Sequence, residues 1–177
     1  MSAIGQGGVE IEVPRGWDGG VHLRVAPVVP PVAEVLGAGA LAGGDLAPAE
    51  AATGDSAALV TVHAATFPLP PVRGDYGSGA VETMGAEDVF VSLLEFGASS
   101  TGSALFSQAG LVLPLDPEAF TTQQLQRPQR GQGGLQVFFT EAGRSFCAYV
   151  VIGSWAQRHR LVPLASELLA GLRIAAG

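Results

Sequence analysis

Lysine is missing from this sequence, and cysteine and charged residues are scarce. The 177 residues include nine basic side chains, all of them arginine, and 16 acidic ones, so the formal net charge is -7. This charge opposes attraction to phosphate backbones, and no arginine run interleaved with aromatic residues offsets it locally. The single cysteine, Cys147, excludes an internal disulfide, and its place in an apolar run indicates a buried, inert thiol. We therefore expect neither a nucleic-acid partner nor a disulfide scaffold.

The sequence also lacks the segments that direct a chain into or through a membrane. Its start, MSAIGQGGVEIEV, has neither a basic beginning nor an apolar core. No apolar run approaches the roughly 20 residues that span a bilayer. We expect a cytoplasmic protein without membrane insertion.

Length and composition favour one ordered domain. The chain has 177 residues, of which 47% are hydrophobic, and this is enough for a single core over residues 1–177. The stretch 28–56 is dominated by Pro, Ala and Gly and shows no sustained period. It is predicted to be a long mobile loop.

Alternation of apolar and polar residues predicts about six strands. Segments 9–13 and 21–25 are joined by PRGWDGG and are predicted to pair as a hairpin, with Glu10 and Glu12 facing Arg24. Segment 57–67 predicts a third strand. Segment 88–96 is apolar on both faces, which is typical of an interior strand.

The strongest local signal lies in segment 135–155, where two β-rich runs flank the turn EAGR and predict a hairpin. A leucine-rich stripe at helical spacing over 161–172 predicts an amphipathic helix that packs on the sheet. Asp116 and Pro117 predict the start of a short helix over 117–126, followed by an exposed flexible loop over 126–134. The predicted fold class is α+β: a twisted antiparallel sheet of about six strands with the C-terminal helix on one face.

A tryptophan in the turn between the first two predicted strands calls for an explanation. Trp17 follows the first strand, where it can fold back over the open end of the sheet and bury its ring. We expect this structural role; stacking on a ligand is the alternative.

The order of elements resembles a known group. An opening strand followed by VPRGW, later hairpin strands and a final helix running into LRI are similar to the PsbP-like α/β/α sandwich. The blocks GDYGSGAVETMGAEDVFVSLLEFG and GRSFCAYVVIGS also resemble actinobacterial proteins of similar length. The resemblance implies a non-catalytic module that binds or positions another protein. It transfers no functional residue to this sequence.

Several catalytic and cofactor signatures are absent from the sequence. GDYGSGA approaches a nucleophile elbow but lacks the G-x-S-x-G spacing. None of His22, His63 and His159 has a second ligand at a metal-binding spacing. No P-loop and no G-x-G-x-x-G element lies between a strand and a helix. We therefore predict no cofactor, no metal and no catalytic residue.

Charge distribution provides the candidate binding residues. Solvated loops are the simpler interpretation; the alternative is a pair of complementary patches through which copies or partners dock. Trp155, at the end of a strand beside a basic turn, is a candidate interface tryptophan. The candidate charged residues are acidic before the interior strand and basic in two later connections: Asp75, Glu82 and Glu87, and Arg127, Arg130, Arg158 and Arg160.

Two functions from different classes follow from these observations. The first is a non-enzymatic protein-interaction or assembly module, whose partner is another protein or a copy of itself. The alternative is a protein that binds an apolar small ligand, or a weak hydrolase that uses His63 with Asp75 or Asp88.

Overall fold

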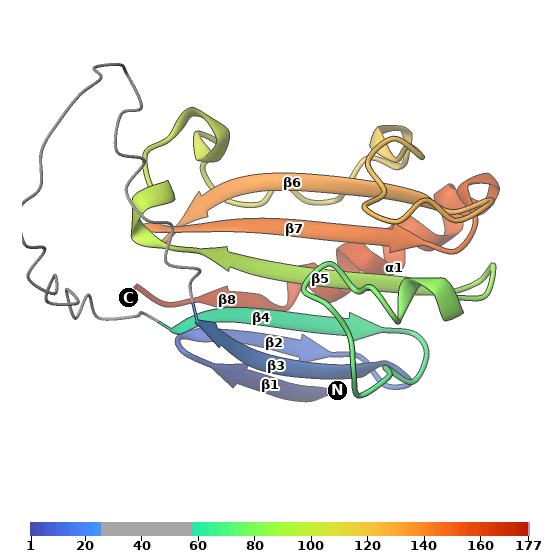
Figure 1. Ribbon diagram of the computed structural model, residues 1–177, viewed down its shortest axis with the longest axis horizontal. Helices are drawn as coiled ribbons and strands as arrows, with labels where there is room; N and C mark the ends of the chain where they lie inside the picture. Colours follow the sequence, from blue (N-terminus) through green and yellow to red (C-terminus); the bar gives the residue numbers. More distant parts are fainter. Residues whose placement is uncertain (26–57, 177) are drawn as a thin grey trace, which may run out of the picture.

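The computed structural model contains two antiparallel sheets and one α-helix, and it describes residues 1–25 and 58–176 (Figure 1). The larger sheet has the strand order β3-β4-β5-β7-β6, and the smaller has the order β1-β2-β8. The predicted α+β class is therefore confirmed. The element bounds are β1 Ser2–Gln6, β2 Val9–Val13, β3 Asp18–Val25, β4 Ala58–Ala65, β5 Val89–Phe96, β6 Gly133–Glu141, β7 Arg144–Ile152, α1 Arg158–Ala170 and β8 Leu172–Ile174.

The centre of the five-stranded sheet follows the sequence prediction. Strand β5 lies between β4 and β7, and its residues from Val89 to Glu95 are buried. Its apolar side chains therefore contact neighbours on both faces of the sheet, as the lack of alternation indicated.

The predicted hairpin over 135–155 forms β6 and β7. Glu141 pairs with Arg144, and the two residues between them, Ala142 and Gly143, have φ values of 52° and 76°. Positive φ at both central positions is the geometry that matches the twist of paired strands. The glycine in EAGR is thus placed where the turn requires it.

The predicted amphipathic helix forms α1, which lies beside the small sheet on one face of the large sheet (Figure 1). Leu161, Ala165, Leu168 and Leu169 are buried, and the helix contacts β2, β5 and β7. Its leucine-rich face joins a core that includes Val9, Ile11 and Val13 of β2 and one face of the larger sheet. The helix ends at Ala170, so Leu172 belongs to β8.

The predicted hairpin of 9–13 with 21–25 is wrong. Both strands exist, but β2 pairs with β1 and β8, whereas β3 pairs with β4. Glu10 stands opposite Arg173, and Glu12 forms an ion pair with Arg173 at 3.6 Å, so neither faces Arg24. The sequence indicated each strand correctly, but the partners of β2 are short segments, SAIGQ and LRI, that show little alternation.

Trp17 lies in the corner where the chain passes from the small sheet to the large one. Its backbone N–H donates to the Pro14 carbonyl at 3.2 Å, and Gly16 before it has φ 88°. The ring is partly buried and packs against the main core. This position fits the structural role expected from the sequence.

The predicted helix over 117–126 is limited to one 3-10 turn, Pro117–Ala119. Asp116 caps this turn as expected, because its carboxylate accepts the Glu118 N–H at 2.9 Å. The chain then extends along β6, where Thr121 exchanges two backbone hydrogen bonds with Gly134. This pairing competes with helix formation and replaces it.

Other predictions over loops are met in part. The predicted loop 126–134 is exposed through much of its length, but Gln132 is buried and Gly133 begins β6. The predicted mobile loop at 28–56 lies outside the described residues. Among the helices that the structure describes, none is both long and apolar enough to span a membrane.

Candidate functional site

The five-stranded sheet has one apolar face and one partly polar face. The apolar face lies against α1 and β2. On the opposite face, Thr61 and His63 of β4 and Ser92 of β5 are all buried. Side chains alternate along strands, so His22 and Arg24 of β3 share this face with Thr61 and His63.

Arg73 connects the two histidines of this face. It lies in the loop that follows β4, and its Nε donates to His63 Nδ1 at 2.8 Å. One terminal nitrogen, Nη2, contacts His22 Nε2 at 2.5 Å, and the other, Nη1, donates to the Pro70 carbonyl at 2.7 Å. Both imidazoles accept from the guanidinium, which requires them to be neutral.

The Asp75 main chain holds the other side of His63. His63 Nε2 donates to the Asp75 carbonyl at 2.9 Å, and Ser92 Oγ donates to the same oxygen at 2.7 Å. The tautomer of His63 follows from these contacts: the proton is on Nε2, and Nδ1 accepts from Arg73.

Burial and the neighbouring cation keep the histidines neutral. Burial lowers the pKa of His63 to about 4, with the hydrogen bond to Asp75 opposing this shift and Arg73 and His22 adding to it. Burial and Arg73 also lower the pKa of His22. Near neutral pH, the positive charge here therefore resides on the arginines.

A cavity of about 210 Å³ opens beside this cluster. Two buried polar atoms of its lining residues have no hydrogen-bond partner among the described residues. These atoms are Thr61 Oγ1 and Arg24 Nε. Arg24 donates from a terminal nitrogen to the Glu95 carbonyl, and its Nε lies 3.8 Å from an Asp75 carboxylate oxygen. The cavity is lined by His22, Leu23, Arg24, Thr61, His63, Pro71, Arg73 and Asp75.

The pairs proposed for a hydrolase are not assembled. His63 contacts the carbonyl of Asp75 rather than its carboxylate, and both of its ring nitrogens are engaged. The Asp88 carboxylate accepts from Gly85 N–H at 2.7 Å and from Thr66 Oγ1 at 3.2 Å. Cys147 is fully buried, and burial raises its pKa to about 12, so its thiol is poorly suited to act as a nucleophile.

Most of the predicted acidic and basic residues form ion pairs within the molecule. Two pairs join candidate residues to each other, and two join a candidate to Glu118 or to Arg24, so the surface has mixed charge rather than two separate patches. Arg130 has no ion pair among the described residues. The pairs are Glu82 with Arg127 at 3.6 Å, Glu87 with Arg160 at 2.8 Å, Glu118 with Arg158 at 3.1 Å and Asp75 with Arg24 at 3.8 Å.

Trp155 has a structural anchor as well as an exposed surface. Its Nε1 donates to the Phe120 carbonyl at 2.8 Å, and the Arg158 guanidinium lies 4.0 Å from the ring centroid. The residue remains 42% exposed. It thus fixes the loop beside α1, and its position beside an already paired arginine leaves little charge free for a partner.

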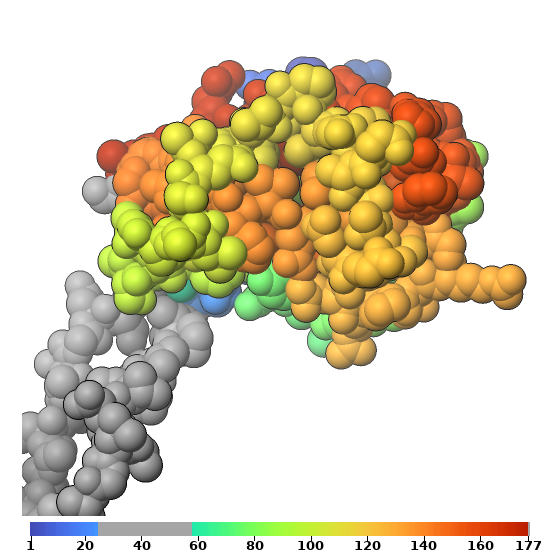
Figure 2. Space-filling view, turned by 90° about the horizontal axis from the view of Figure 1, so that it is seen from above, coloured from blue at the N-terminus to red at the C-terminus, as the bar shows by residue number. Residues whose placement is uncertain are grey.

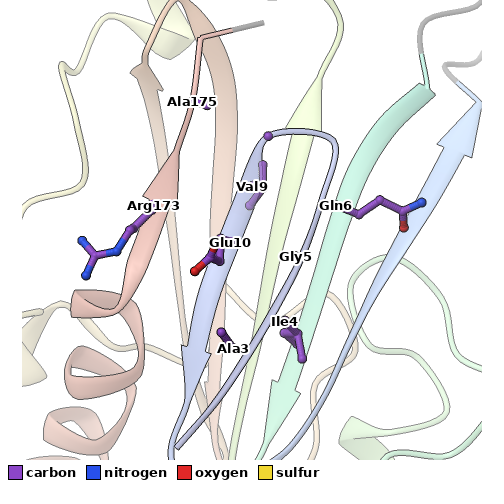
Figure 3. Close-up of a pocket in the computed structure, with 9 residues that line it drawn as sticks. Ala3, Ile4, Gly5, Gln6, Val9, Glu10, Arg173 and Ala175 are labelled. Carbon is purple, nitrogen blue, oxygen red and sulfur yellow. The ribbon is translucent and has the colours of Figure 1, made fainter.

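A larger cavity lies elsewhere, on the outer side of the small sheet. Figure 3 shows its lining from β1, β2 and β8, and its volume is about 450 Å³. Glu10 and Arg173 are its only charged lining residues, and the rest are small, apolar or amide side chains such as Ala3 and Gly5. None of its lining residues is a buried polar side chain, in contrast to the cavity beside His63.

Sequence reasoning missed most of the cavity residues. The predicted pairing of 21–25 with 9–13 places His22 and Arg24 beside the wrong strand, so it does not predict that they lie next to Thr61 and His63. Arg73 lies in the proline-rich segment PLPPVRGDY, which follows the predicted strand over 57–67 and has no periodic pattern that places its side chains. The period-2 pattern of β3 and β4 would have been the usable signal, because it places polar residues of both strands on one face.

No group of three or more metal-binding side chains is present in the part of the chain that the structure describes. Comparison with models of known protein families, with curated proteins and with solved structures found no match to this chain.

Proposed function

We propose that this protein is a non-enzymatic interaction module of the PsbP-like kind that its sequence resembles. Its docking surface is the open edge of β3 together with the cavity beside it. The occupant is an extended segment of another protein that lies along β3. The observation that carries this proposal is a cavity with buried, unpartnered polar atoms next to exposed apolar side chains.

Exposed apolar residues lie beside the cavity. Pro71 lines it and Val72 follows Pro71 in the chain, whereas Leu23 belongs to the adjoining edge strand β3 and its side chain points to the other face of the sheet, towards Gly7. Leu23 is 46% exposed and Val72 is 86% exposed. Apolar contacts around a polar centre are typical of protein interfaces, where a few side chains provide most of the binding energy.

The backbone of β3 supports the same surface. Among the described residues, the backbone of β3 pairs with β4 only. An edge strand presents a row of free N–H and C=O groups, to which an extended segment can add as a further strand. Main-chain hydrogen bonds would provide affinity, and the cavity would provide specificity.

Catalysis has less support from this geometry. Both nitrogens of His63 are engaged in hydrogen bonds that orient the ring, and its lowered pKa makes it a weak base near neutral pH. The cluster has the character of a rigid recognition site.

The test is capture from the host with two matched variants of the full chain. Leu23→Glu places a charge on the proposed surface, and Leu105→Glu places one on a leucine that is 57% exposed in a different segment. We expect the same protein to be recovered with the wild type and with Leu105→Glu, and lost with Leu23→Glu. With that partner purified, amide exchange in residues 20–24 should slow in the complex.

Three outcomes would contradict the proposal. They are equal recovery with Leu23→Glu, recovery of no protein by the wild type, and recovery of only further copies of this chain. The melting temperature of both variants should stay close to that of the wild type, because the substituted side chains are already exposed.

A further inference from the structure

We infer that the cavity between β3, β4 and the 70–75 loop is a carboxylate-binding site, in which Arg73, Arg24 and Thr61 hold one carboxylate of the docking segment. This inference rests on the proposed function, because it specifies which group of the partner enters the cavity.

Arg73 is a cation whose partners are all uncharged. It bonds two neutral imidazoles and a carbonyl, and no carboxylate lies within 4.0 Å of it among the described residues. Buried charges are normally paired, because removing an ion from water is costly. Arg73 is partly buried, Asp18 acts on it electrostatically from more than 4.0 Å away, and an anion in the cavity would supply a counter-charge in direct contact.

Two further donor atoms at the cavity have no hydrogen-bond acceptor among the described residues. The Thr61 side chain is 1% exposed, and its hydroxyl has no partner among the described residues. The buried Nε of Arg24 likewise has none within hydrogen-bond distance. Both residues line the same cavity as Arg73. A hydroxyl and two guanidinium groups around one space can all donate to an oxyanion.

The charge of the lining favours a monovalent group. Arg24 and Arg73 contribute two positive charges and Asp75 one negative charge, while His22 and His63 are neutral near pH 7. The lining thus carries one net positive charge in a chain whose net charge is -7. One carboxylate neutralises it, whereas a phosphate dianion would leave an excess of negative charge.

The test uses acetate, inorganic phosphate and chloride as probes at matched ionic strength, and it follows the imidazole NMR signals of His22 and His63. We expect saturable shifts with acetate, with a Kd on the order of 10 mM because one small group provides only a fraction of an interface. Arg73→Gln should weaken acetate binding at least about tenfold. Arg160→Gln, which removes an exposed arginine of α1 on the other face of the sheet, should leave it unchanged.

Thr61→Val separates recognition from folding. Removing a buried hydroxyl that has no partner should leave the melting temperature equal or raise it, because no hydrogen bond is lost. The same change should weaken acetate binding about fivefold if the hydroxyl donates to the carboxylate. Unchanged acetate affinity in this variant would overturn its assigned role.

The remaining outcomes separate this inference from the proposed function. Shifts that do not saturate, or that chloride reproduces, would overturn the carboxylate site even if Leu23→Glu abolishes partner capture. Saturable binding of phosphate but not acetate would overturn it in favour of a phosphate group. Acetate binding with normal partner capture by Leu23→Glu would retain the site and overturn the docking surface.

Discussion

The two edges of the five-stranded sheet differ in how their backbone groups are satisfied. Along β6, the segment 108–125 covers the edge. Gly110 N–H donates to the Thr140 carbonyl at 2.8 Å, and Gln136 N–H donates to Gln124 Oε1 at 2.6 Å. Figure 2 shows this yellow and amber segment lying over the β6 side of the molecule. Along β3, no segment among the described residues pairs with the outer edge by backbone hydrogen bonds, although β1 of the small sheet packs close to β3. Within residues 1–25 and 58–176, the β3 edge is therefore the place suited to strand addition.

The largest effect is expected on the covered edge. Leu125 is buried against Gly134, where a Cβ built on the glycine would lie 2.8 Å from a Leu125 methyl carbon. Leu125→Ala should lower the free energy of unfolding by about 2 to 3 kcal/mol, because it leaves a cavity under the covering segment. Denaturant unfolding measures this change. Leu105→Ala is the matched control and should have little effect; equal losses in both variants would show that the segment is not anchored at Leu125.

A pH-dependent effect is expected on the open side. The pKa of His63 is about 4 in the folded protein and about 6.5 in the unfolded chain, so the unfolded state binds more protons between these values. The stabilisation is complete above about pH 6.5 and is lost as the pH falls towards 4. When the pH is lowered from about 7.5 to about 5, the titration of His63 should reduce the free energy of unfolding by about 2 kcal/mol.

The measurement is unfolding at both pH values in the wild type and in two variants. His63→Gln should flatten the pH dependence, because glutamine does not titrate. His159→Gln, at an exposed histidine, should preserve it. A steep wild-type slope that survives in His63→Gln would assign the effect to other groups.

A smaller effect is expected from one capping side chain on the covered edge. Gln124→Ala removes the acceptor of the Gln136 N–H and should lower the free energy of unfolding by about 1 kcal/mol. Gln123→Ala changes an exposed neighbour and should be neutral. Amide exchange at Gln136 should speed up in the first variant only; unchanged exchange there would show that water replaces the cap without cost.

Strand positions were predictable wherever alternation or a turn signal was strong. The hairpin of β6 and β7, the interior strand β5 and helix α1 all followed from local patterns, because their own side chains determine which face is buried. The partners of β2 did not follow, since β1 and β8 are short and their pairing joins distant parts of the chain. The helix predicted over 117–126 does not form beyond its first turn for a related reason. Thr121 is hydrogen-bonded to Gly134, a tertiary contact that local helix propensity does not predict.

The candidate site was less predictable than the fold. His63 was recognised as a residue of interest from its strand face, but its contacts with Arg73 and the Asp75 carbonyl arise from a loop that folds back over the sheet. Of the charged residues chosen from their positions in the sequence, four pair with each other and Arg158 pairs with Glu118. Local sequence showed where charges occur, and the tertiary fold decided which of them were left without a counter-charge.

The three-stranded sheet has a consequence for synthesis of the protein on the ribosome. Val9 pairs with Ile174, and the apolar side of β2 is covered by α1, so β2 has only its partner β1 nearby until β8 and α1 are translated much later. Until they emerge, Val9, Ile11 and Val13 form an apolar strip on a nascent chain without its final neighbours. Such strips are binding sites for chaperones and sources of aggregation. The yield of folded protein should therefore depend on how quickly residues 158–174 follow, and slow codons just before them should lower it.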